Sequence, residues 1–478
     1  MSSHRELRIR AAGSKKLTTL CYTDTELSVT DGRLDKVPLR QVLAARRNGL
    51  NMEVAYIGRK KKEPMFLTTL VGTVEEAEED VLDAWLETLL HLAYEGVKRG
   101  RRVKVIINPH SGTKKGVAVF NKTIEPILRS AQCTLDISHT TRSGHAYEIA
   151  KTLSLDYDAM VIVSGDGLVH EVLNGFAHHE QPLNAFRIPL APIPTGSGNG
   201  LAINLLGMAD GFDVCAATLN VVKGLPMKVD VCSLTQNGKR TLSFMSQVVG
   251  LIADLDIGTD HLRWMGEARF TYGFLRGLIQ FKACPVQLSY KSVQVDKDEM
   301  FAIYQKRRTE AKANEATREG LPELAMDETA LPSLKYSTTD EDGWTVVDKP
   351  LLYVLGGKGP YLGRDFMAFP VSLPDDGLID LIAQEVFAQK KYQSARTEFL
   401  SAFGGDAANG GTFWKSSVNY VKASAYRVKP LSPKGAFAVD GEVFPFEEYQ
   451  VEAHQGLATL LSPHGYYAAE LAGRPTKP

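Results

Sequence analysis

The sequence has few cysteines, and no two of them have metal-binding spacing. Five occur in 478 residues, an odd number without a CxxC pair. They are Cys21, Cys133, Cys215, Cys232 and Cys284. This distribution argues against a disulfide framework or a cysteine zinc site. It is typical of reduced, mostly buried thiols in a cytosolic protein.

Long apolar runs and an excess of one charge are also missing. The first ten residues, "MSSHRELRIR", contain no apolar signal core, and no run approaches the ~20 apolar residues that cross a bilayer. The formal net charge is -1, and no basic patch is interleaved with aromatic residues. We therefore expect no nucleic-acid partner, and a cytoplasmic protein that is soluble or sits on a membrane surface.

The length and the changing hydrophobic pattern predict three regions. A chain of 478 residues is too long for one ordinary core. Residues 1–98 are expected to form short strands and one terminal helix, a layout that resembles a pleckstrin-homology-like module. The basic run 58–62 is either a solvated hairpin tip or a contact for anionic lipid. The predicted apolar stripe of the helix is Val81, Ala84, Trp85, Leu89 and Leu92.

The rest of the chain changes from alternating strands and helices to strands alone. Residues 99–228 predict a parallel sheet with crossover helices. Residues 229–470 predict a largely antiparallel β domain, interrupted by helices in "HLRWMGEARFTYGFLRGLIQF" and "KKYQSARTEFLSAF". Within it, residues 296–347 are charged and poor in aromatics, and we interpret them as a mobile insertion.

One strand ends in an unusual turn, "SGDG", at residues 164–167, followed at once by a helix. Two glycines and a helix N-terminus form a turn that attracts an anion, most often a phosphate. Asp166 places a negative charge in the same turn. It is either a cap of an ordinary strand-to-helix turn, or a group that meets a metal ion or accepts a proton at the phosphate.

Similar turns end two other predicted strands, which makes a phosphate cradle the favoured interpretation. They are "NPHSG" at 108–112 and "PTGSGN" at 194–199, and a late turn, "DGE", lies at 440–442. The carboxyl ends of strands in an open α/β sheet are where ligands bind. Neither the GxxxxGK[ST] nor the GxGxxG pattern fits, so a Walker-type NTPase and an NAD-dependent dehydrogenase are not supported.

Taken in order, these blocks resemble the sphingosine (long-chain base) kinases of the diacylglycerol-kinase catalytic superfamily. The blocks are "NPHSGTKKG", "SGDGLVHEVLNG", "PTGSGNGLA", the stretch 244–273 and "VDGE". Leu168 follows GDG where diacylglycerol kinases usually have Thr. The resemblance implies a Rossmann-like α/β domain of the NAD kinase and diacylglycerol kinase type, with an antiparallel β-sandwich as the C-terminal domain.

The resemblance also implies roles for individual residues. Asp166 corresponds to the catalytic base, whereas no metal ligand is assigned. His110 stands where many relatives carry Arg, so this sequence departs from the pattern there. The implied nucleotide site consists of Asn108, Pro109, His110, Thr140, Gly165, Gly167, Ser197, Gly198, Arg263, Arg269, Asp440, Gly441 and Glu442.

Asp256, Ser246 and Ser164 match positions that hold the polar head of a sphingoid base. A sphingoid base carries an ammonium group that diacylglycerol and ceramide lack, so a carboxylate beside it selects the substrate class. Asp254 lies two residues away and is an alternative for that carboxylate.

The resemblance implies an ATP- and Mg²⁺-dependent kinase acting on the primary hydroxyl of sphingosine, dihydrosphingosine or phytosphingosine. A ceramide or diacylglycerol kinase is one alternative, and a catalytically silent lipid-binding scaffold is another. The long alkyl chain of the substrate implies peripheral contact with a membrane surface, and a homodimer is possible.

Overall fold

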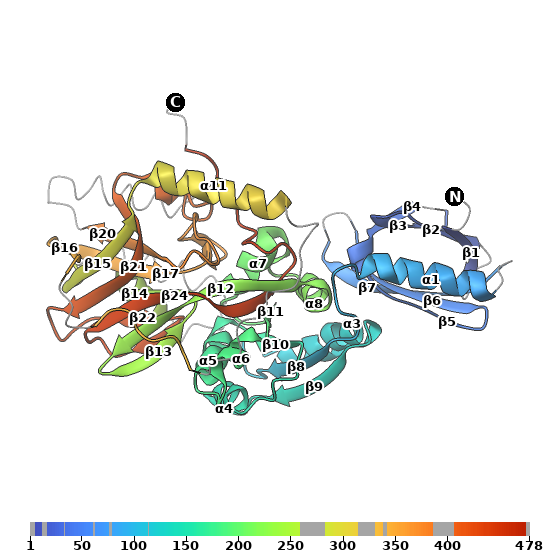
Figure 1. Ribbon diagram of the computed structural model, residues 1–478, viewed down its shortest axis with the longest axis horizontal. Coiled ribbons are helices and arrows are strands. Elements are labelled where there is room, and N and C mark those ends of the chain that lie inside the picture. The colour runs from blue at the N-terminus through green and yellow to red at the C-terminus, as the bar shows by residue number, and fades with distance from the viewer. Residues whose placement is uncertain are drawn as a thin grey trace.

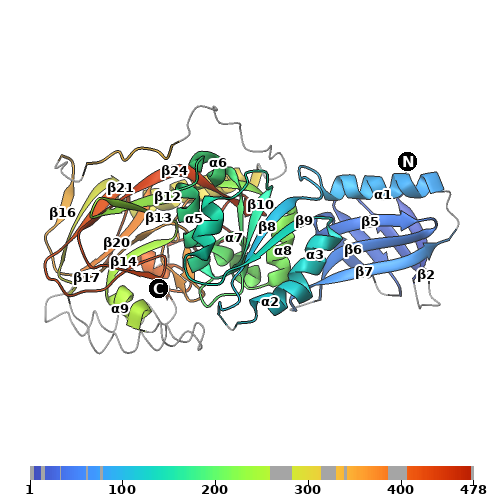
Figure 2. The same ribbon diagram turned by 90° about the horizontal axis from the view of Figure 1, so that it is seen from below.

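The computed structural model describes most of the chain. The described residues are 5–11, 17–32, 34–60, 63–75, 79–112, 114–258, 283–313, 330–337, 342–385 and 406–474. Three regions follow one another along the long axis, and both views show the same order (Figures 1 and 2). Both helices that the sequence predicted within the β domain lie outside the described residues. A shorter helix just before the first of them, α9, spans Leu251–Gly258.

The N-terminal region is one antiparallel sheet of seven strands with a helix against it. The strand order is β4-β3-β2-β1-β7-β6-β5. Helix α1, Glu79–Ala93, follows the last strand. The strands are β1 Glu6–Ala11, β2 Leu17–Tyr22, β3 Glu26–Thr30, β4 Leu34–Pro38, β5 Val42–Asn48, β6 Asn51–Arg59 and β7 Met65–Val74.

The apolar face of α1 is rotated from the predicted one. Trp85 and Leu89 are buried as predicted, but Val81 is 41% exposed and Ala84 is also exposed. The buried residues are Leu82, Trp85, Leu86, Leu89 and Ala93. Both stripes have helical spacing and share Trp85, which packs on Tyr22 of the sheet at 5.1 Å between ring centroids. They differ in that Leu82 and Leu86 are buried instead of Val81 and Ala84.

The N-terminal region shares a continuous hydrophobic core with the α/β region. Polar groups reinforce the contact. The N–H of Met65 in β7 donates to Asp213 Oδ2 of the α/β region at 2.7 Å. Lys223 Nζ donates to Ala93 O at 2.9 Å, at the end of α1. Together with the shared core, these hydrogen bonds hold the two regions against each other.

The middle region is a parallel sheet in the order β9-β8-β10-β11, as predicted. Strand β10 is buried along its whole length, as expected of a strand covered on both faces. The strands are β8 Arg102–Ile107, β9 Thr134–His139, β10 Ala159–Ser164 and β11 Leu190–Pro194. The helices are α2 Gly116–Val119, a π-helical turn Phe120–Ile124, α3 Glu125–Ser130, α4 His145–Lys151, α5 Asp166–Ala177, α6 Pro182–Arg187, α7 Gly200–Asp210 and α8 Val214–Lys223.

None of the single helices among the described residues has the length and apolarity needed to span a membrane; α7 and α8 pass that test only as a pair bent by 107°.

The late strands are antiparallel, as predicted, and all but β18 and β19, which form a separate two-stranded sheet, extend the parallel sheet. Strand β24 joins the two parts, because it pairs with β11 in parallel and with β12 and β21 in antiparallel fashion. The resulting sheet has 15 strands. The late strands are β12 Leu225–Gln236, β13 Lys239–Ser243, β14 Ser246–Gly250, β15 Val286–Gln294, β16 Thr345–Val347, β17 Leu351–Gly357, β18 Tyr361–Gly363, β19 Phe366–Met367, β20 Ile379–Glu385, β21 Val418–Pro430, β22 Phe437–Val439, β23 Glu442–Phe444 and β24 Tyr449–Ser462.

Part of the segment 296–347, which we interpreted as a mobile insertion, is a helix. Residues Lys297–Ala313 form α11, which lies across the β region (Figure 1). Met300 and Tyr304, four residues apart, are its buried residues. Tyr304 Oη donates to Ala469 O at 3.0 Å, so the C-terminal segment fastens the helix. This helix leaves little sign in the sequence, because it is highly charged and only two of its residues are buried.

A buried network of charges lies inside the β region. Lys358 Nζ is 2.9 Å from Asp230 and 2.6 Å from Asp376, and Lys422 Nζ is 2.8 Å from Asp376 and 3.0 Å from Asp380. Burial alone lowers the pKa of Lys358, but the surrounding carboxylates outweigh that effect and the net shift is upward. Lys358 is therefore a buried cation in the folded protein, and its removal leaves buried carboxylates without their counter-charge.

We expect Lys358→Met to lower the free energy of unfolding by about 3–5 kcal/mol, because breaking one side of a buried ion pair leaves an uncompensated charge. The matched control is Lys349→Met. Lys349 pairs with Glu385 on the surface, so its loss is expected to cost less than about 1 kcal/mol. Urea unfolding of the three proteins measures both values. Equal losses in the two variants contradict the prediction.

Candidate active site

Three turns meet where the parallel strands end. Strands β8, β10 and β11 are neighbours, so their carboxyl ends lie at one edge of the sheet. The N–H of Asn108 donates to Val163 O at 3.1 Å, and the N–H of Thr195 donates to Ser164 O at 3.3 Å. Ser164 Oγ donates to Ser111 Oγ at 3.1 Å. The three glycine turns that the sequence singled out therefore form one continuous surface.

Two of these turns touch through their backbones. A Cβ on Gly196 would lie 2.3 Å from Gly165 Cα, and a Cβ on Gly165 would lie 2.6 Å from Gly198 O. Gly112 has φ +51°, and a Cβ there would lie 2.5 Å from Thr195 O. Only glycine allows backbones to approach this closely. Because Asp166 follows Gly165 directly, this contact places Asp166 at the centre of the three turns.

Asp166 is the first residue of α5, and it is buried. Its Oδ2 accepts from the N–H of Gly200 at 2.7 Å, and its Oδ1 accepts from the N–H of Leu201 at 3.2 Å. These two residues begin α7, so the positive end of that helix holds the carboxylate. The N–H of Asp166 donates to Gly198 O at 3.1 Å. Both oxygens keep lone pairs for a further donor.

The acidity of Asp166 reflects two opposing effects. Burial raises its pKa from the ordinary 3.8, the two backbone donors lower it, and the charge of Asp440 raises it further, to about 6. The group is therefore mostly ionised at neutral pH, but it accepts a proton more readily than an exposed aspartate. A carboxyl group with these properties is suited to general-base chemistry.

The late "DGE" turn comes from the β region and reaches the same place. Asp440 has φ +50° and its carboxylate is buried. It accepts from the N–H groups of Phe244, Met245 and Ser246, from Ser243 Oγ and from His170 Nδ1, at 2.8–3.2 Å. Gly441 and Glu442 are exposed. A Cβ on Gly167 would lie 3.0 Å from Glu442 Oε1, so Glu442 lies beside the first turn of α5.

The other residues predicted to bind the nucleotide differ in how exposed they are. Pro109 and Ser197 are half-buried in their turns, and Thr140 is buried, its N–H donating to Ile107 O at 2.9 Å. His110 is exposed, and its N–H donates to Asn108 Oδ1 at 2.9 Å. Together with the turns above, they surround the same edge of the sheet.

The predicted substrate-side residues are less fully described. Ser246 is buried at the start of β14, and its N–H donates to Asp440. Asp254 is exposed on α9, whereas the side chain of Asp256 lies outside the described part of the chain, as do Arg263 and Arg269. The choice between Asp254 and Asp256 stays a prediction.

His170 and Asn174 were missed by the sequence analysis, although both stand in the quoted block "SGDGLVHEVLNG". They follow Asp166 by four and eight residues, so they lie on the same face of α5. Both contact the β region, His170 at Asp440 and Asn174 at Leu242. The helical spacing from Asp166 was the signal that could have identified them.

Among the residues that the structure describes, no cluster of three or more His, Cys, Asp or Glu side chains could hold a metal ion. The cradle itself suits a polyphosphate. It offers backbone N–H groups, glycines whose Cβ would fill it, and the buried hydroxyl of Thr195, which has no hydrogen-bond partner.

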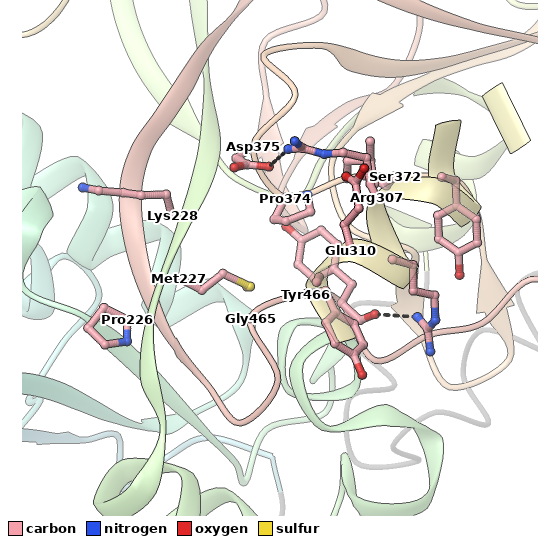
Figure 3. Close-up of a pocket in the computed structure, with 15 residues that line it drawn as sticks. Pro226, Met227, Lys228, Arg307, Glu310, Ser372, Pro374, Asp375, Gly465 and Tyr466 are labelled. Atoms are coloured by element: carbon pink, nitrogen blue, oxygen red, sulfur yellow. Dashed lines mark hydrogen bonds and ion pairs between the residues drawn. The ribbon is translucent and has the colours of Figure 1, made fainter. Parts of the chain in front are cut away.

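A separate cavity of about 360 Å³ lies between α11, the start of β12 and the segment after β24 (Figure 3). None of the predicted site residues lines it. Both of its arginines have partners, since Arg307 binds Asp375 at 2.9 Å and Arg308 donates to Tyr467 O at 3.0 Å. The cavity is therefore not part of the candidate active site.

Comparisons with known proteins place these features in a family. Residues 102–234 match the diacylglycerol kinase catalytic domain, and residues 3–95 match a domain of unknown function (DUF7493). A putative diacylglycerol kinase from Bacillus anthracis has a similar fold, with a TM-score of 0.51 at 21% identity over 77% of this chain and 97% of that one. The α/β region and its turns thus define a protein of the diacylglycerol kinase catalytic type.

Full-length relatives narrow the class. Sphingoid long chain base kinase 4 of Schizosaccharomyces pombe is 32% identical over 89% of this chain and 88% of its own length. Sphingosine kinase 1 of Homo sapiens is 29% identical over 76% of this chain and 91% of its own length. The chain belongs to the sphingoid long-chain base kinase family.

The glycine contacts predict different costs for two substitutions in one turn. Gly165→Ala places a methyl group against backbone and is expected to lower the free energy of unfolding by about 1–3 kcal/mol. Gly167→Ala meets only the end of the Glu442 side chain, and it gains up to about 1 kcal/mol of helix propensity. We expect it to be neutral or stabilising. Urea unfolding compares the two variants; similar losses contradict the backbone contact.

Proposed function

We propose that this chain transfers the γ-phosphoryl group of ATP to the primary hydroxyl of a sphingoid long-chain base. The observation that carries the proposal is Asp166, a buried, ionisable carboxylate at the centre of three phosphate-type turns. Membership of a family whose relatives bear the names of sphingoid base kinases supports the choice of acceptor.

The nucleotide is proposed to bind along the edge formed by the three turns. Asn108, Pro109, His110 and Thr140 line one side of this edge, and Gly165, Gly167, Ser197 and Gly198 line the other. Glu442 and Gly441 close the site from the β region, and Arg263 and Arg269 are proposed to neutralise phosphate charge. Mg²⁺ is proposed to enter with ATP and, when bound, to screen the charge of the phosphates.

Asp166 acts as the base in this proposal. In a loose phosphoryl-transfer transition state the acceptor hydroxyl loses its proton late, so a weak base is sufficient if it lies within hydrogen-bond reach. The α7 N–H groups hold the carboxylate in place and leave lone pairs for the hydroxyl. The base needs no reorientation during the reaction, because two fixed donors orient it.

Substrate choice is proposed to depend on an acid beside the amino group of the base. Asp256 is the preferred residue and Asp254 the alternative, with Ser246 and Ser164 near the polar head. A carboxylate left without a cation on binding a neutral lipid costs roughly 3–5 kcal/mol, which is about two to four powers of ten in affinity. Ceramide and diacylglycerol are therefore expected to be poor substrates.

The finer architecture and the setting of the enzyme are also proposals. The seven-stranded sheet with α1 supports a pleckstrin-homology-like assignment of residues 1–98, and the antiparallel strands support a β-sandwich for the late region. Because a sphingoid base is held in a membrane, we propose a cytoplasmic protein that contacts membrane surfaces peripherally.

The acceptor is tested with [γ-³²P]ATP, Mg²⁺ and a panel of sphingosine, dihydrosphingosine, phytosphingosine, ceramide and diacylglycerol. Thin-layer analysis of the products is expected to give label in the sphingoid bases, at rates about 10²-fold or more above the neutral lipids. Preference for a neutral lipid would overturn the substrate assignment. Binding of sphingosine without any labelled product favours the silent lipid-binding scaffold.

The role of Asp166 predicts a pH dependence. Because the base must be ionised and its pKa is about 6, kcat/KM should be constant above pH 7 and fall tenfold per unit well below pH 6. Asp166→Asn should lose at least about 10²-fold of the activity and lack this limb. Lipid phosphorylation measured from pH 5 to 8.5 checks both points. Unchanged activity of Asp166→Asn refutes the base assignment.

A further inference from the structure

Helix α5 carries a polar stripe that begins at the candidate base. Asp166, His170 and Asn174 are spaced by four residues, so each lies about 6 Å along the helix axis from the one before. Asp166 faces the glycine turns of its own region, whereas the other two side chains contact the β region. The stripe therefore links the base rigidly to a surface across the domain junction.

His170 makes the first of these contacts. Its Nδ1 lies 2.8 Å from Asp440 Oδ2, and because a carboxylate only accepts, the Nδ1–H donates. His170 is the one donor to Asp440 from the α/β region among the described residues; Ser243 Oγ and the three N–H groups that follow it belong to the β region. His170 is thus the cross-domain partner of a fully buried charge.

The surroundings of His170 favour its protonated form. Burial lowers its pKa, but the hydrogen bond that His170 donates to Asp440 and the charges of Asp440, Glu442 and Glu171 raise it, and the net shift is upward. The ring also lies edge-on to Phe444, at 6.4 Å between centroids. Both Asp440 and Phe444 flank the exposed Glu442 turn, so His170 contacts the two ends of that turn.

Asn174 makes the second contact. Its Nδ2 donates to Leu242 O at 2.9 Å, and its Oδ1 accepts from the N–H of Leu242 at 2.9 Å. This two-bond pairing copies the pairing of neighbouring strands and holds the end of β13 against α5. Leu242 directly precedes the turn 243–246 whose donors surround Asp440. Figures 1 and 2 both place α5 beside β13.

We propose that His170 and Asn174 are positioning residues that latch the β region onto α5 and set the approach of Glu442 to the phosphate-binding turn at Gly167. The latch acts through Asp440, so neither residue needs to touch the nucleotide. This inference rests on the proposed function, which assigns nucleotide binding to these turns. The contacts of the latch do not depend on which lipid is the acceptor.

The test compares His170→Ala, His170→Asn and Asn174→Ala with the unaltered chain. His170→Ala should lower kcat/KM for ATP by about 10²-fold, because a 1 Å displacement of a positioned group has effects of that size. The KM for sphingosine should stay unchanged. His170→Asn should recover part of the loss, because the amide nitrogen of Asn, like Nδ1 of His, is two bonds from Cβ and can donate to Asp440. Asn174→Ala should act in the same direction without unpairing a buried charge.

The matched control is His178→Ala. His178 follows Asn174 by four residues, directly after the end of α5, but it is exposed and contacts Tyr147 and Asn174 O within its own region. We expect wild-type constants for both substrates. Thermal unfolding of each variant identifies any general loss of stability.

A second measurement separates this inference from the proposed function. Affinity for a non-hydrolysable ATP analogue, measured without lipid, should fall in His170→Ala and partly return in His170→Asn. That result supports the latch even if the wild-type chain phosphorylates no sphingoid base, which would refute only the function. Wild-type analogue affinity and kcat in folded His170→Ala overturn the latch. So does a loss that affects both substrates equally and is not rescued by Asn.

Discussion

The candidate site depends on the contact between the backbones of two glycine turns. Gly165 and Gly196 approach so closely that neither tolerates a Cβ without movement of the main chain. That approach brings the start of α5 against the start of α7, and the first N–H groups of α7 then hold both oxygens of Asp166. A carboxylate inside an anion-binding cradle is stable there because a helix N-terminus pairs with it.

The same contact explains how a buried acid can be ionised and still basic. Removal from water disfavours its charge, whereas two fixed N–H donors favour it, and the compromise leaves a pKa of about 6. An exposed aspartate would be a weaker base, and a buried one without donors would be neutral. The protein therefore sets the acidity of Asp166 mainly by burial and by backbone donors, and the charge of Asp440 adds to the rise.

The regions of the chain are interlocked rather than strung together. Strand β24 belongs to the sheets of both the middle and late regions. Lys223 and Asp213 tie the N-terminal region to the middle one through hydrogen bonds with Ala93 and Met65. The family model of unknown function that matches residues 3–95 thus corresponds to a region that shares its core with the catalytic domain. Its docking is part of the fold.

Local patterns predicted the elements well where burial is periodic or complete. Strand β10 and the order of the glycine turns both follow from short stretches, because turn chemistry and burial pattern are local properties. Helix α11 escaped prediction because two residues anchor it, and the face of α1 was misplaced because two stripes of equal spacing compete.

Short stretches of neighbouring residues encode the parallel sheet, the three turns and the identity of the acid. The groups that surround that acid follow from the three-dimensional packing of the chain. Gly200, Asp440 and His170 lie 34, 274 and 4 residues from it. The chain gives no local signal that Gly200 donates to it, that the charge of Asp440 raises its pKa, or that His170 reaches across the junction. Such contacts arise from packing between distant segments, and packing has no local pattern to read.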